Sequence, residues 1–362
     1  MEAFRKIKTA GVKGTFLDDQ ENPVFEEADV CVLGVAFDAT ASYKKGAFFG
    51  PSAIMDASHE IEHEIPVFGV SLAEKVKIHW LGLLEYEEEK QEKKDFEKRD
   101  ALAGQMVSDV EEIASKAFEK HKFLVTLGGE HSVSNGIFNA IAKKFNAKKV
   151  TIVHIDAHLD LRDSFEGMKY SHGSVMKNAL DAGFRIISLG IRDQVSFEEI
   201  ETIKEKGIAG RIFPCPVMPS AFYTKKGVFE KNQFLWKGII SAKIAKKIFS
   251  MIKTPFVYLT IDVDGFDPMF FPGTGTPLPF GLDFASGQEF LFSLMQFCKK
   301  SKKQLLGFDV QETAPQLQKN AEKYSHEDAV STQTEMNAAI LIYNLIAWNF
   351  LERFSGKNKK RQ

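Results

Sequence analysis

Short apolar runs alternate with longer amphipathic stretches along most of the chain. The runs are rich in β-branched and aromatic residues, which is typical of strands, whereas apolar positions spaced three and four apart indicate helices. We predict strands at Val30–Phe37, Val76–Leu81, Phe123–Leu127, Val150–Ile155, Arg185–Leu189, Phe256–Ile261 and Leu305–Val310. We predict helices at Asp95–His121, Ser134–Lys144, Ser174–Ala182, Ser196–Lys206, Ala242–Ile252, Ala285–Lys300 and Glu335–Phe354.

The order of these elements predicts the fold class. Strands that are apolar on both faces are typical of a sheet buried between two layers. Strands that alternate with helices indicate a parallel sheet, so we expect an α/β fold with helices covering both faces. No internal repeat or Pro- and Ser-rich linker divides the chain, and we expect residues 1–362 to form one domain with a frayed polar tail at 356–362.

Polar side chains follow four of the predicted strands at the point where each strand ends. In an open parallel sheet, ligands bind beyond the carboxyl ends of the strands, so we expect these side chains to meet at one edge. The four segments are Gly128–Ser132 (GGEHS), Asp156–Asp160 (DAHLD), Asp262–Pro268 (DVDGFDP) and Gln311–Pro315 (QETAP).

The acids in these segments predict a metal centre. In DAHLD, alternation places Asp156, His158 and Asp160 on one face of an extended segment. Four carboxylates packed together without counter-ions would have to take up protons, whereas two divalent cations would cancel their charge. A single DxD motif is weak evidence of metal binding, but several such motifs at strand ends are strong evidence together. The predicted ligands are His131, Asp156, His158, Asp160, Asp262 and Asp264.

The chemistry of this donor set favours Mn²⁺. Carboxylate oxygens with two imidazoles and no thiolate suit Mn²⁺ better than a structural zinc ion. Two ions sharing bridging carboxylates would lie about 3.5–4 Å apart and could hold one water between them. Such a centre can lower the pKa of water from about 15.7 toward 7, which makes hydroxide available at neutral pH.

Bulk composition excludes several other classes of protein. A net charge of -2 over 362 residues argues against a nucleic-acid-binding protein, and no apolar run approaches the roughly 18 residues that span a bilayer. The N-terminus lacks the apolar core of a secretory signal. Cys31, Cys215 and Cys298 are widely spaced and form no CxxC, which suits a reducing compartment. We therefore expect a cytoplasmic protein.

Taken together, the motifs GGEHS, DAHLD and DVDGFDP resemble those of the ureohydrolases, the family of arginase and agmatinase. Four further segments also resemble the family's pattern: KGAFFGPSAI (45–54), SHGS (171–174), GTGTP (273–277) and Glu312 in QETAP. The resemblance covers about residues 29–350. It implies a three-layer α/β/α fold around a parallel, roughly eight-stranded sheet, and a homo-oligomer.

The resemblance also implies a ligand set for each of two Mn²⁺ ions. One ion would be held by His131, Asp156, Asp160 and Asp262. The other would be held by Asp156, His158, Asp262 and Asp264, so that Asp156 and Asp262 bridge the pair.

The implied reaction is hydrolysis of a guanidino group to urea and an amine. A hydroxide bridging the two metals would attack the guanidino carbon, and Glu312 would accept paired N–H bonds from the substrate. Thr276 would help to orient the same group, and Asp160 would pass a proton to the departing amine. His172 would contact the substrate and exchange protons with solvent.

The substrate is predicted from the loops around these motifs. Arginases typically carry an acid two residues beyond the aspartate that corresponds to Asp193, and that position here is Val195. The loop LRDSFEGMKYSHGS resembles agmatinase loops, so we predict hydrolysis of agmatine to putrescine and urea, a step of polyamine biosynthesis. The alternatives are guanidinobutyrate, N1-aminopropylagmatine, arginine and formiminoglutamate. A more remote alternative is a non-catalytic binding protein on the same fold.

Several residues keep more than one interpretation. His154 could share the face of Asp156, but a hydrogen-bonded core histidine is the simpler hypothesis. Asp193 is either a structural hydrogen-bond acceptor or part of a pocket wall. Glu130 is expected to support the loop that carries His131. The aromatic segment 211–236 is a specificity loop, a subunit contact or a packed insertion.

Overall fold

In the computed structural model, residues 14–17, 22–65, 67–87, 95–217, 228–319 and 323–354 are described. A sheet of eight strands lies at its centre, in the order β4-β1-β5-β10-β9-β6-β7-β8, and every neighbouring pair is parallel. The strands are β1 (Val30–Ala36), β4 (Ile78–Glu85), β5 (Phe123–Leu127), β6 (Val150–Ile155), β7 (Arg185–Leu189), β8 (Ile212–Phe213), β9 (Phe256–Asp262) and β10 (Gln304–Gln311). Two small antiparallel pairs lie outside this sheet: β2 (Glu64–Ile65) with β3 (Val70–Ser71), and β11 (Gln316–Leu317) with β12 (Ala329–Ser331).

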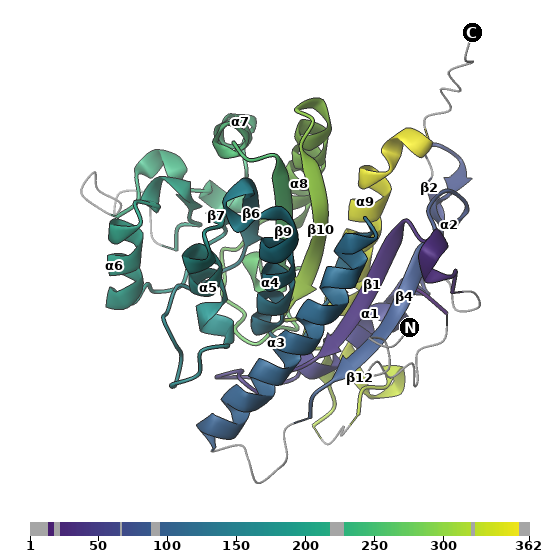
Figure 1. The fold of residues 1–362 in the computed structure, drawn as a ribbon, viewed down its shortest axis with the longest axis horizontal. Coiled ribbons are helices and arrows are strands. Elements are labelled where there is room, and N and C mark those ends of the chain that lie inside the picture. The colour runs from purple at the N-terminus through teal and green to yellow at the C-terminus, as the bar shows by residue number, and fades with distance from the viewer. Residues whose placement is uncertain are drawn as a thin grey trace.

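Helices cover both faces of the sheet (Figure 1). One face packs against α1 (Gly50–Ser58), α7 (Ala242–Met251), α8 (Phe284–Lys300) and α9 (Gln333–Asn349). The other face packs against α3 (Phe96–Glu119), α4 (Ser134–Phe145), α5 (Val175–Ala182) and α6 (Phe197–Glu205). The short helix α2 (Leu72–Lys75) precedes β4. The predicted three-layer α/β/α architecture is therefore confirmed.

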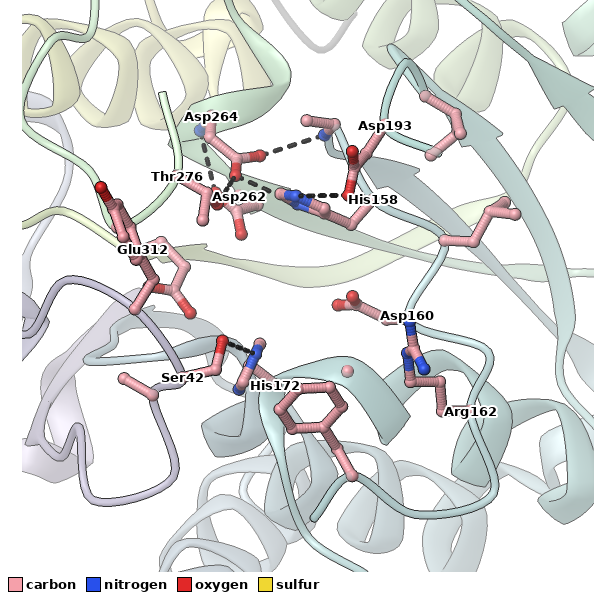
Figure 2. A pocket seen from close by; sticks show the side chains of 18 of the residues that line it. Ser42, His158, Asp160, Arg162, His172, Asp193, Asp262, Asp264, Thr276 and Glu312 are labelled. Atoms are coloured by element: carbon pink, nitrogen blue, oxygen red, sulfur yellow. Dashed lines mark hydrogen bonds and ion pairs between the residues drawn. The ribbon is translucent and has the colours of Figure 1, made fainter. Parts of the chain in front are cut away.

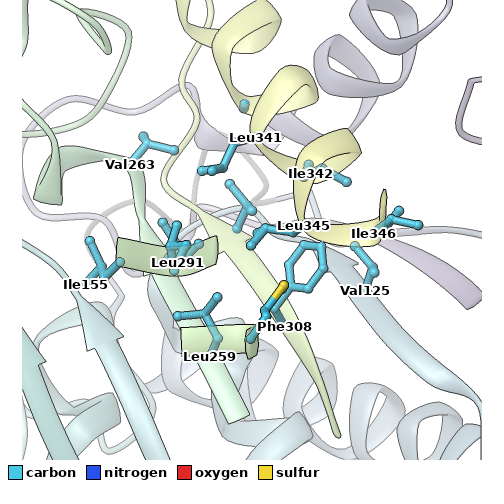
Figure 3. Packing of buried hydrophobic residues seen from close by; sticks show 14 of the residues in the cluster. Val125, Ile155, Leu259, Val263, Leu291, Phe308, Leu341, Ile342, Leu345 and Ile346 are labelled. Carbon is cyan, nitrogen blue, oxygen red and sulfur yellow. The ribbon is translucent and has the colours of Figure 1, made fainter. Parts of the chain in front are cut away.

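Each layer is held by apolar side chains from successive strand positions. Val125 and Leu127 of β5 point to the face covered by α9, whereas Leu124 points to the other face. In Figure 3, Phe308 of β10 packs against Leu345 of α9, and both are fully buried. Because the strands are apolar on both sides, they could be recognised in the sequence as continuous runs rather than as an alternating pattern.

The helices begin where the sequence supplies an N-cap. Asp95 accepts a hydrogen bond from the backbone N–H of Lys98 at the start of α3. Ser196 and Glu199 form a reciprocal capping box at the start of α6. The sequence did not predict α1, which begins with Gly50 and Pro51. A Gly-Pro pair is typical of turns, although proline is also compatible with the first turn of a helix.

The strand order positions the functional site. β5 and β6 follow one another in the sequence but are separated in the sheet by β10 and β9. The carboxyl ends of β5, β10, β9 and β6 therefore lie side by side, and the four predicted polar segments leave from these four ends. Within the described ranges, none of the helices is both long and apolar enough to cross a bilayer. The predicted frayed tail at 356–362 lies outside the described residues.

Candidate metal centre

The turn that carries His131 is fixed by close backbone contacts after β5. A Cβ atom on Gly129 would lie 1.9 Å from the carbonyl oxygen of Phe37, so any other residue would displace the turn. The backbone N–H of Glu130 donates to that same oxygen at 2.8 Å, and Glu312 N–H donates to the carbonyl of Gly129 at 2.7 Å. These contacts hold His131 between the ends of β1 and β10.

The segment after β6 delivers three donors to the same place. Asp156 follows the last strand residue, and its backbone N–H bonds to the carbonyl of Leu189 at 3.0 Å. Asp160 has a φ of 53°, in the left-handed region that side chains with a Cβ rarely adopt. Its carbonyl accepts a hydrogen bond from the N–H of Lys177, which helps to hold this strained backbone. Strain of this kind is concentrated at functional sites.

The loop after β9 carries Asp262 and Asp264 and is held by Arg192. The Arg192 guanidinium donates to the carbonyl oxygens of Asp264 at 2.6 Å and Phe266 at 3.2 Å, and also reaches that of Leu278 at 2.6 Å. Arg192 is buried, and its guanidinium N–H groups hydrogen-bond to backbone carbonyls of the loop. This buried charged group therefore fixes the position of the loop. The sequence analysis missed this role. The sequence did offer one indication of this role, because Arg192 follows strand β7 at the same edge of the sheet as the predicted ligands.

The predicted ligand atoms converge. His131 Nδ1 lies 3.0 Å from Asp156 Oδ2, 3.2 Å from Asp160 Oδ2 and 3.7 Å from Asp262 Oδ2. His158 Nδ1 lies 3.2 Å from Asp264 Oδ2 and 3.3 Å from an oxygen of Asp156. The six predicted ligands thus surround two adjoining points, with Asp156 between them.

The hydrogen bonds of His131 indicate which ring nitrogen faces the acids as a bare acceptor. Thr260 Oγ1 donates its proton to Asp309 Oδ1 at 2.6 Å, and it contacts His131 Nε2 at 2.9 Å. Since Thr260 has a single proton, it accepts from Nε2, so Nδ1 carries the lone pair when the ring is neutral. Without a cation, burial acts to lower the pKa of His131, but Asp156 and Asp160 outweigh it, raise that pKa well above its usual value and favour a proton there. Among the described residues, Nδ1 forms no hydrogen bond of acceptable geometry despite its three acidic neighbours. A bare, buried nitrogen among carboxylates fits a cation.

The pKa values of the clustered carboxyl groups also indicate a cation-binding site. Burial raises the pKa of Asp262 well above its usual value, and the carboxylates of Asp264 and Asp156 raise it further. Burial and the charge of Asp156 raise the pKa of Asp160 to about 7. Burial also acts to raise the pKa of Asp156, but His154 and hydrogen bonds from the other histidines outweigh it and hold that pKa well below its usual value. The carboxyls cannot all ionise at neutral pH without added positive charge, and divalent cations would supply it.

His154 is close enough to the acids to be considered a ligand, because its ring lies within the group formed by His131, Asp156 and Asp160. Both of its nitrogens are already engaged, however. Nε2 contacts Asp156 Oδ2 at 2.8 Å and Nδ1 contacts Ser188 Oγ at 3.1 Å. This geometry agrees with the predicted core histidine, which orients Asp156 from inside the strand.

A cavity of about 260 Å³ opens above the acids (Figure 2). Glu312 lines one side of it, at the end of β10, with a φ of 63°. Its Oε1 accepts the backbone N–H of His131 at 3.0 Å, and burial raises its pKa well above the usual value. Thr276, also in the lining, donates its hydroxyl to Asp264 Oδ2 at 3.2 Å.

His172 lines the cavity on the side opposite Asp264 and His158 (Figure 2). Its backbone is set by a capping box between Ser171 and Ser174. Its Nε2 lies 3.1 Å from Ser42 Oγ, and its ring meets Phe165 edge to face at a centroid distance of 5.1 Å. Burial lowers the pKa of His172 to about 4, and the charge of His158 lowers it in the same direction. The sequence analysis did not identify Ser42, which comes from a loop with no motif of its own.

Arg162 and Asp193 line the cavity on the side away from Glu312 (Figure 2), and we call this side the mouth because Asp193 and Gln194 are exposed there. Asp193 Oδ2 lies 3.6 Å from His158 Nε2, and the Asp193 side chain is 46% exposed. Asp193 is therefore part of the cavity wall, whereas its 3.6 Å contact with His158 is too long for a hydrogen bond, so its interpretation as a structural hydrogen-bond acceptor stays a prediction. Val195 also lines the mouth.

The described parts of segment 211–236 are packed beside β8. Gln233 Nε2 donates to the carbonyls of Ala209 and Ile212, both at 2.7 Å, and Leu235 is buried. None of the described residues of this segment lines the cavity. These parts agree with the packed-insertion hypothesis, and residues 218–227 lie outside the described residues.

Comparison with known proteins identifies relatives across almost the whole chain. The sequence profile of the Arginase family matches residues 28–213 and 223–347. N(1)-aminopropylagmatine ureohydrolase of Synechocystis sp. is 35% identical over 308 residues, which cover 85% of this chain and 88% of that protein. Agmatinase of Bacillus anthracis is 31% identical over 332 residues, covering 91% and 95% of the two chains.

Solved structures show the same architecture. The agmatine ureohydrolase of Thermoplasma volcanium superposes with a TM-score of 0.64 at 27% identity, covering 92% of each chain. An arginase from Bacillus subtilis superposes with a TM-score of 0.61 at 19% identity, a level at which the likeness concerns the fold alone.

Proposed function

The chain belongs to the arginase family and is a hydrolase of guanidino C–N bonds, and from this premise we propose that it hydrolyses agmatine to putrescine and urea with two Mn²⁺ ions. The observation that carries the proposal is the convergence of six acids and histidines on two adjoining points beneath a cavity that Glu312 lines.

The proposed ligands fall into two overlapping sets. His131 and Asp160 belong to one ion and His158 and Asp264 to the other, with Asp156 and Asp262 shared. When bound, the two ions supply Lewis-acid activation of water, whose pKa such ions lower from about 15.7 toward 7. Oxygen and imidazole donors without thiolate support Mn²⁺, and Cys31, Cys215 and Cys298 are all free and buried.

The chain's own residues would hold the substrate and move its protons. The charge of a bound guanidinium counters the raised pKa of Glu312, and the resulting carboxylate holds the guanidinium through paired N–H···O bonds, which orients its planar carbon over the acids. Thr276 keeps Asp264 in place through its hydroxyl and borders the same space. Asp160, through the carboxylate oxygen that does not face His131, accepts a proton from the attacking water and returns it to the nitrogen of the leaving amine. His172 exchanges protons between that end of the cavity and solvent.

The residues that line the mouth of the cavity support agmatine as the substrate. A substrate anchored at Glu312 extends its tail toward the mouth, where the half-exposed carboxylate of Asp193 can attract a distal amine. Val195 supplies no group for an α-ammonium. N1-aminopropylagmatine is the second candidate, because the relative of that name is 35% identical and this longer polyamine carries the same positive charge at the mouth. The three free cysteines support a reducing cytoplasmic location, and a homo-oligomer stays a prediction.

A substrate panel tests the proposal. With Mn²⁺ added, we expect urea release to be fastest from agmatine, slower from N1-aminopropylagmatine, and at least about tenfold slower from guanidinobutyrate, whose tail is anionic, because one misplaced charge costs more than the 1.4 kcal/mol of a tenfold effect. Arginine and formiminoglutamate complete the panel. Faster release from any of the other compounds than from agmatine would reject the assigned substrate, and no release from any of them would reject the enzyme.

Substitution of His172 tests its role. We expect His172→Ala to lower kcat by about 10²-fold, the usual contribution of a positioned acid or base, and to leave the Mn²⁺ content unchanged. Metal analysis of the purified variant together with steady-state kinetics on agmatine gives the answer. Loss of Mn²⁺ in this variant, or an unchanged kcat, contradicts the assignment.

A further inference from the structure

His172 stands between two residues to which the proposed reaction gives no part. On one side its Nε2 lies 3.1 Å from Ser42 Oγ, and on the other its Nδ1 lies 3.8 Å from Glu130 Oε2 (Figure 2 shows the first contact). The imidazole therefore lies in a row, with a hydroxyl at the cavity wall and a fully buried carboxylate behind it. A carboxylate that accepts from one ring nitrogen of a neutral imidazole fixes the tautomer, because it leaves the lone pair on the other nitrogen.

The two oxygens of Glu130 have different surroundings. Oε1 accepts hydrogen bonds from the hydroxyls of Thr40 and Ser132, the second at 2.6 Å. Oε2 receives only a long contact of 3.4 Å from the Ser132 N–H and faces the His172 ring. Among the described residues, His172 Nδ1 has no hydrogen bond of good geometry although it is buried, and the backbone of Thr40 is the other group that acts on the ring, raising its pKa. An under-used carboxylate oxygen and the buried Nδ1 thus face each other.

Ser42 is exposed, and its position depends on the contacts that hold its loop. Its loop is closed by Asp38, whose carboxylate accepts the Gly46 N–H at 2.8 Å. The buried Arg99 of α3 donates from Nε to the carbonyl of Ala39 at 2.6 Å, and so ties the loop to a helix of the opposite layer. The hydroxyl is accessible from the cavity, whereas Glu130 is fully buried.

We propose that Ser42, His172 and Glu130 act as one proton relay, in which Glu130 positions His172 and Ser42 carries the proton between His172 and the cavity. The proposal rests on the role assigned to His172 above. Glu130 Oε2 lies 3.8 Å away, and a small movement of the ring would let it accept the Nδ1–H of His172, which leaves Nε2 as the exchanging nitrogen. Ser42 Oγ–H donates its proton to Nε2 while Oγ takes one from a water in the cavity. Nε2–H then returns a proton through Oγ to bulk solvent, to which the exposed Ser42 is open, so the proton taken from the cavity leaves it and the serine ends each transfer with one proton.

Double-mutant cycles test whether the three residues work through one another. We expect Ser42→Ala and Glu130→Gln each to lower kcat for agmatine about tenfold, with KM and Mn²⁺ content little changed. In the His172→Ala background, neither substitution should lower kcat further, because the group through which both act is gone. Ser42→Thr, which keeps the hydroxyl, should restore most of the rate.

Thr40→Val is the matched control for Glu130. It removes a hydrogen bond to Oε1, the oxygen that does not face His172, and keeps the charge and the volume of the site. We expect it to lower the melting temperature without the kcat loss of Glu130→Gln. A kcat loss as large as that of Glu130→Gln would mean that Glu130 only supports the turn, and would overturn the relay.

The outcomes separate this proposal from the proposed function. If His172→Ala slows turnover but Ser42→Ala and Glu130→Gln slow it further by the same factor in both backgrounds, the relay fails and the function stands. The relay also fails if Ser42→Thr is as slow as Ser42→Ala. If the wild type releases no urea from any guanidino compound, the proposed function fails first.

Discussion

Asp262→Asn is expected to abolish most activity and, at the same time, to stabilise the metal-free protein. Asp262 is proposed to bridge both ions, so an amide there removes one negative charge from each ligand set. We expect Mn²⁺ content to fall and kcat to drop about 10³-fold, since a lost metal ion removes several kcal/mol of charge stabilisation, and about 4 kcal/mol is a 10³-fold change in rate.

The opposite effect on the metal-free protein follows from the pKa of Asp262. Burial and the carboxylates of Asp264 and Asp156 raise it well above the unfolded value. A carboxyl with a raised pKa destabilises the folded state at any pH where the unfolded chain is ionised, and that penalty grows as the pH rises. An asparagine carries no such penalty. After chelation, we therefore expect Asp262→Asn to melt at a higher temperature than the wild type at pH 7, and the difference to shrink toward pH 4.

Asp267→Asn supplies the control for this reversal. Asp267 belongs to the same loop, but its oxygens accept the backbone N–H groups of Met269 at 3.0 Å and Gly281 at 3.1 Å, outside the predicted ligand set. We expect this change to weaken the turn with and without metal, and to leave Mn²⁺ content intact. Thermal melts of all three proteins, with and without chelator, together with metal analysis, decide the matter. A chelated Asp262→Asn protein that melts below the chelated wild type would be evidence against a site built for cations.

The clustering of the proposed metal ligands was predictable from the sequence because parallel strands deliver their carboxyl ends to one edge. Buried strands without a solvent face leave an unmistakable pattern, so Phe123–Leu127 and Val150–Ile155 were predicted with both ends correct. Once these ends were placed, the acids that follow them had only one place to meet. The prediction of β4 was less accurate: the structure places it at Ile78–Glu85, because pairing with β1 carries the strand on through a stretch poor in β-branched residues.

The groups behind and beside the predicted ligands were harder to find. Asp309 gave a signal, since an acid in the apolar run LLGFDV needs a buried partner, and the structure supplies Thr260. Ser42 gave none. Its contact with His172 spans 130 residues and depends on the order of the strands, which hydrophobic periodicity does not encode. Sequence reasoning therefore recovered the groups that follow strands, and the structure added those that come from loops.

Glu312→Gln is expected to cause the largest loss of substrate binding in the transition state. The substitution keeps the size of the side chain and its contact with the His131 N–H, but removes the charge that pairs with a guanidinium. Truncating one partner of a buried charged pair costs about 2–5 kcal/mol, so we expect kcat/KM for agmatine to fall between about 30-fold and several thousandfold. Mn²⁺ content should not change, because Glu312 is outside both proposed ligand sets.

Glu312→Asp separates charge from reach. It keeps the carboxylate but withdraws it by one methylene, so the paired N–H bonds lengthen while the electrostatic attraction is retained. We expect its kcat/KM to lie between those of the wild type and Glu312→Gln. Steady-state kinetics of the three proteins at equal Mn²⁺ occupancy provide the comparison. If Glu312→Gln turns agmatine over at the wild-type rate, the guanidinium is bound elsewhere, and the orientation of the substrate in the cavity must be reversed. If it instead loses its metal, then Glu312 acts on the ions through the His131 turn rather than on the substrate.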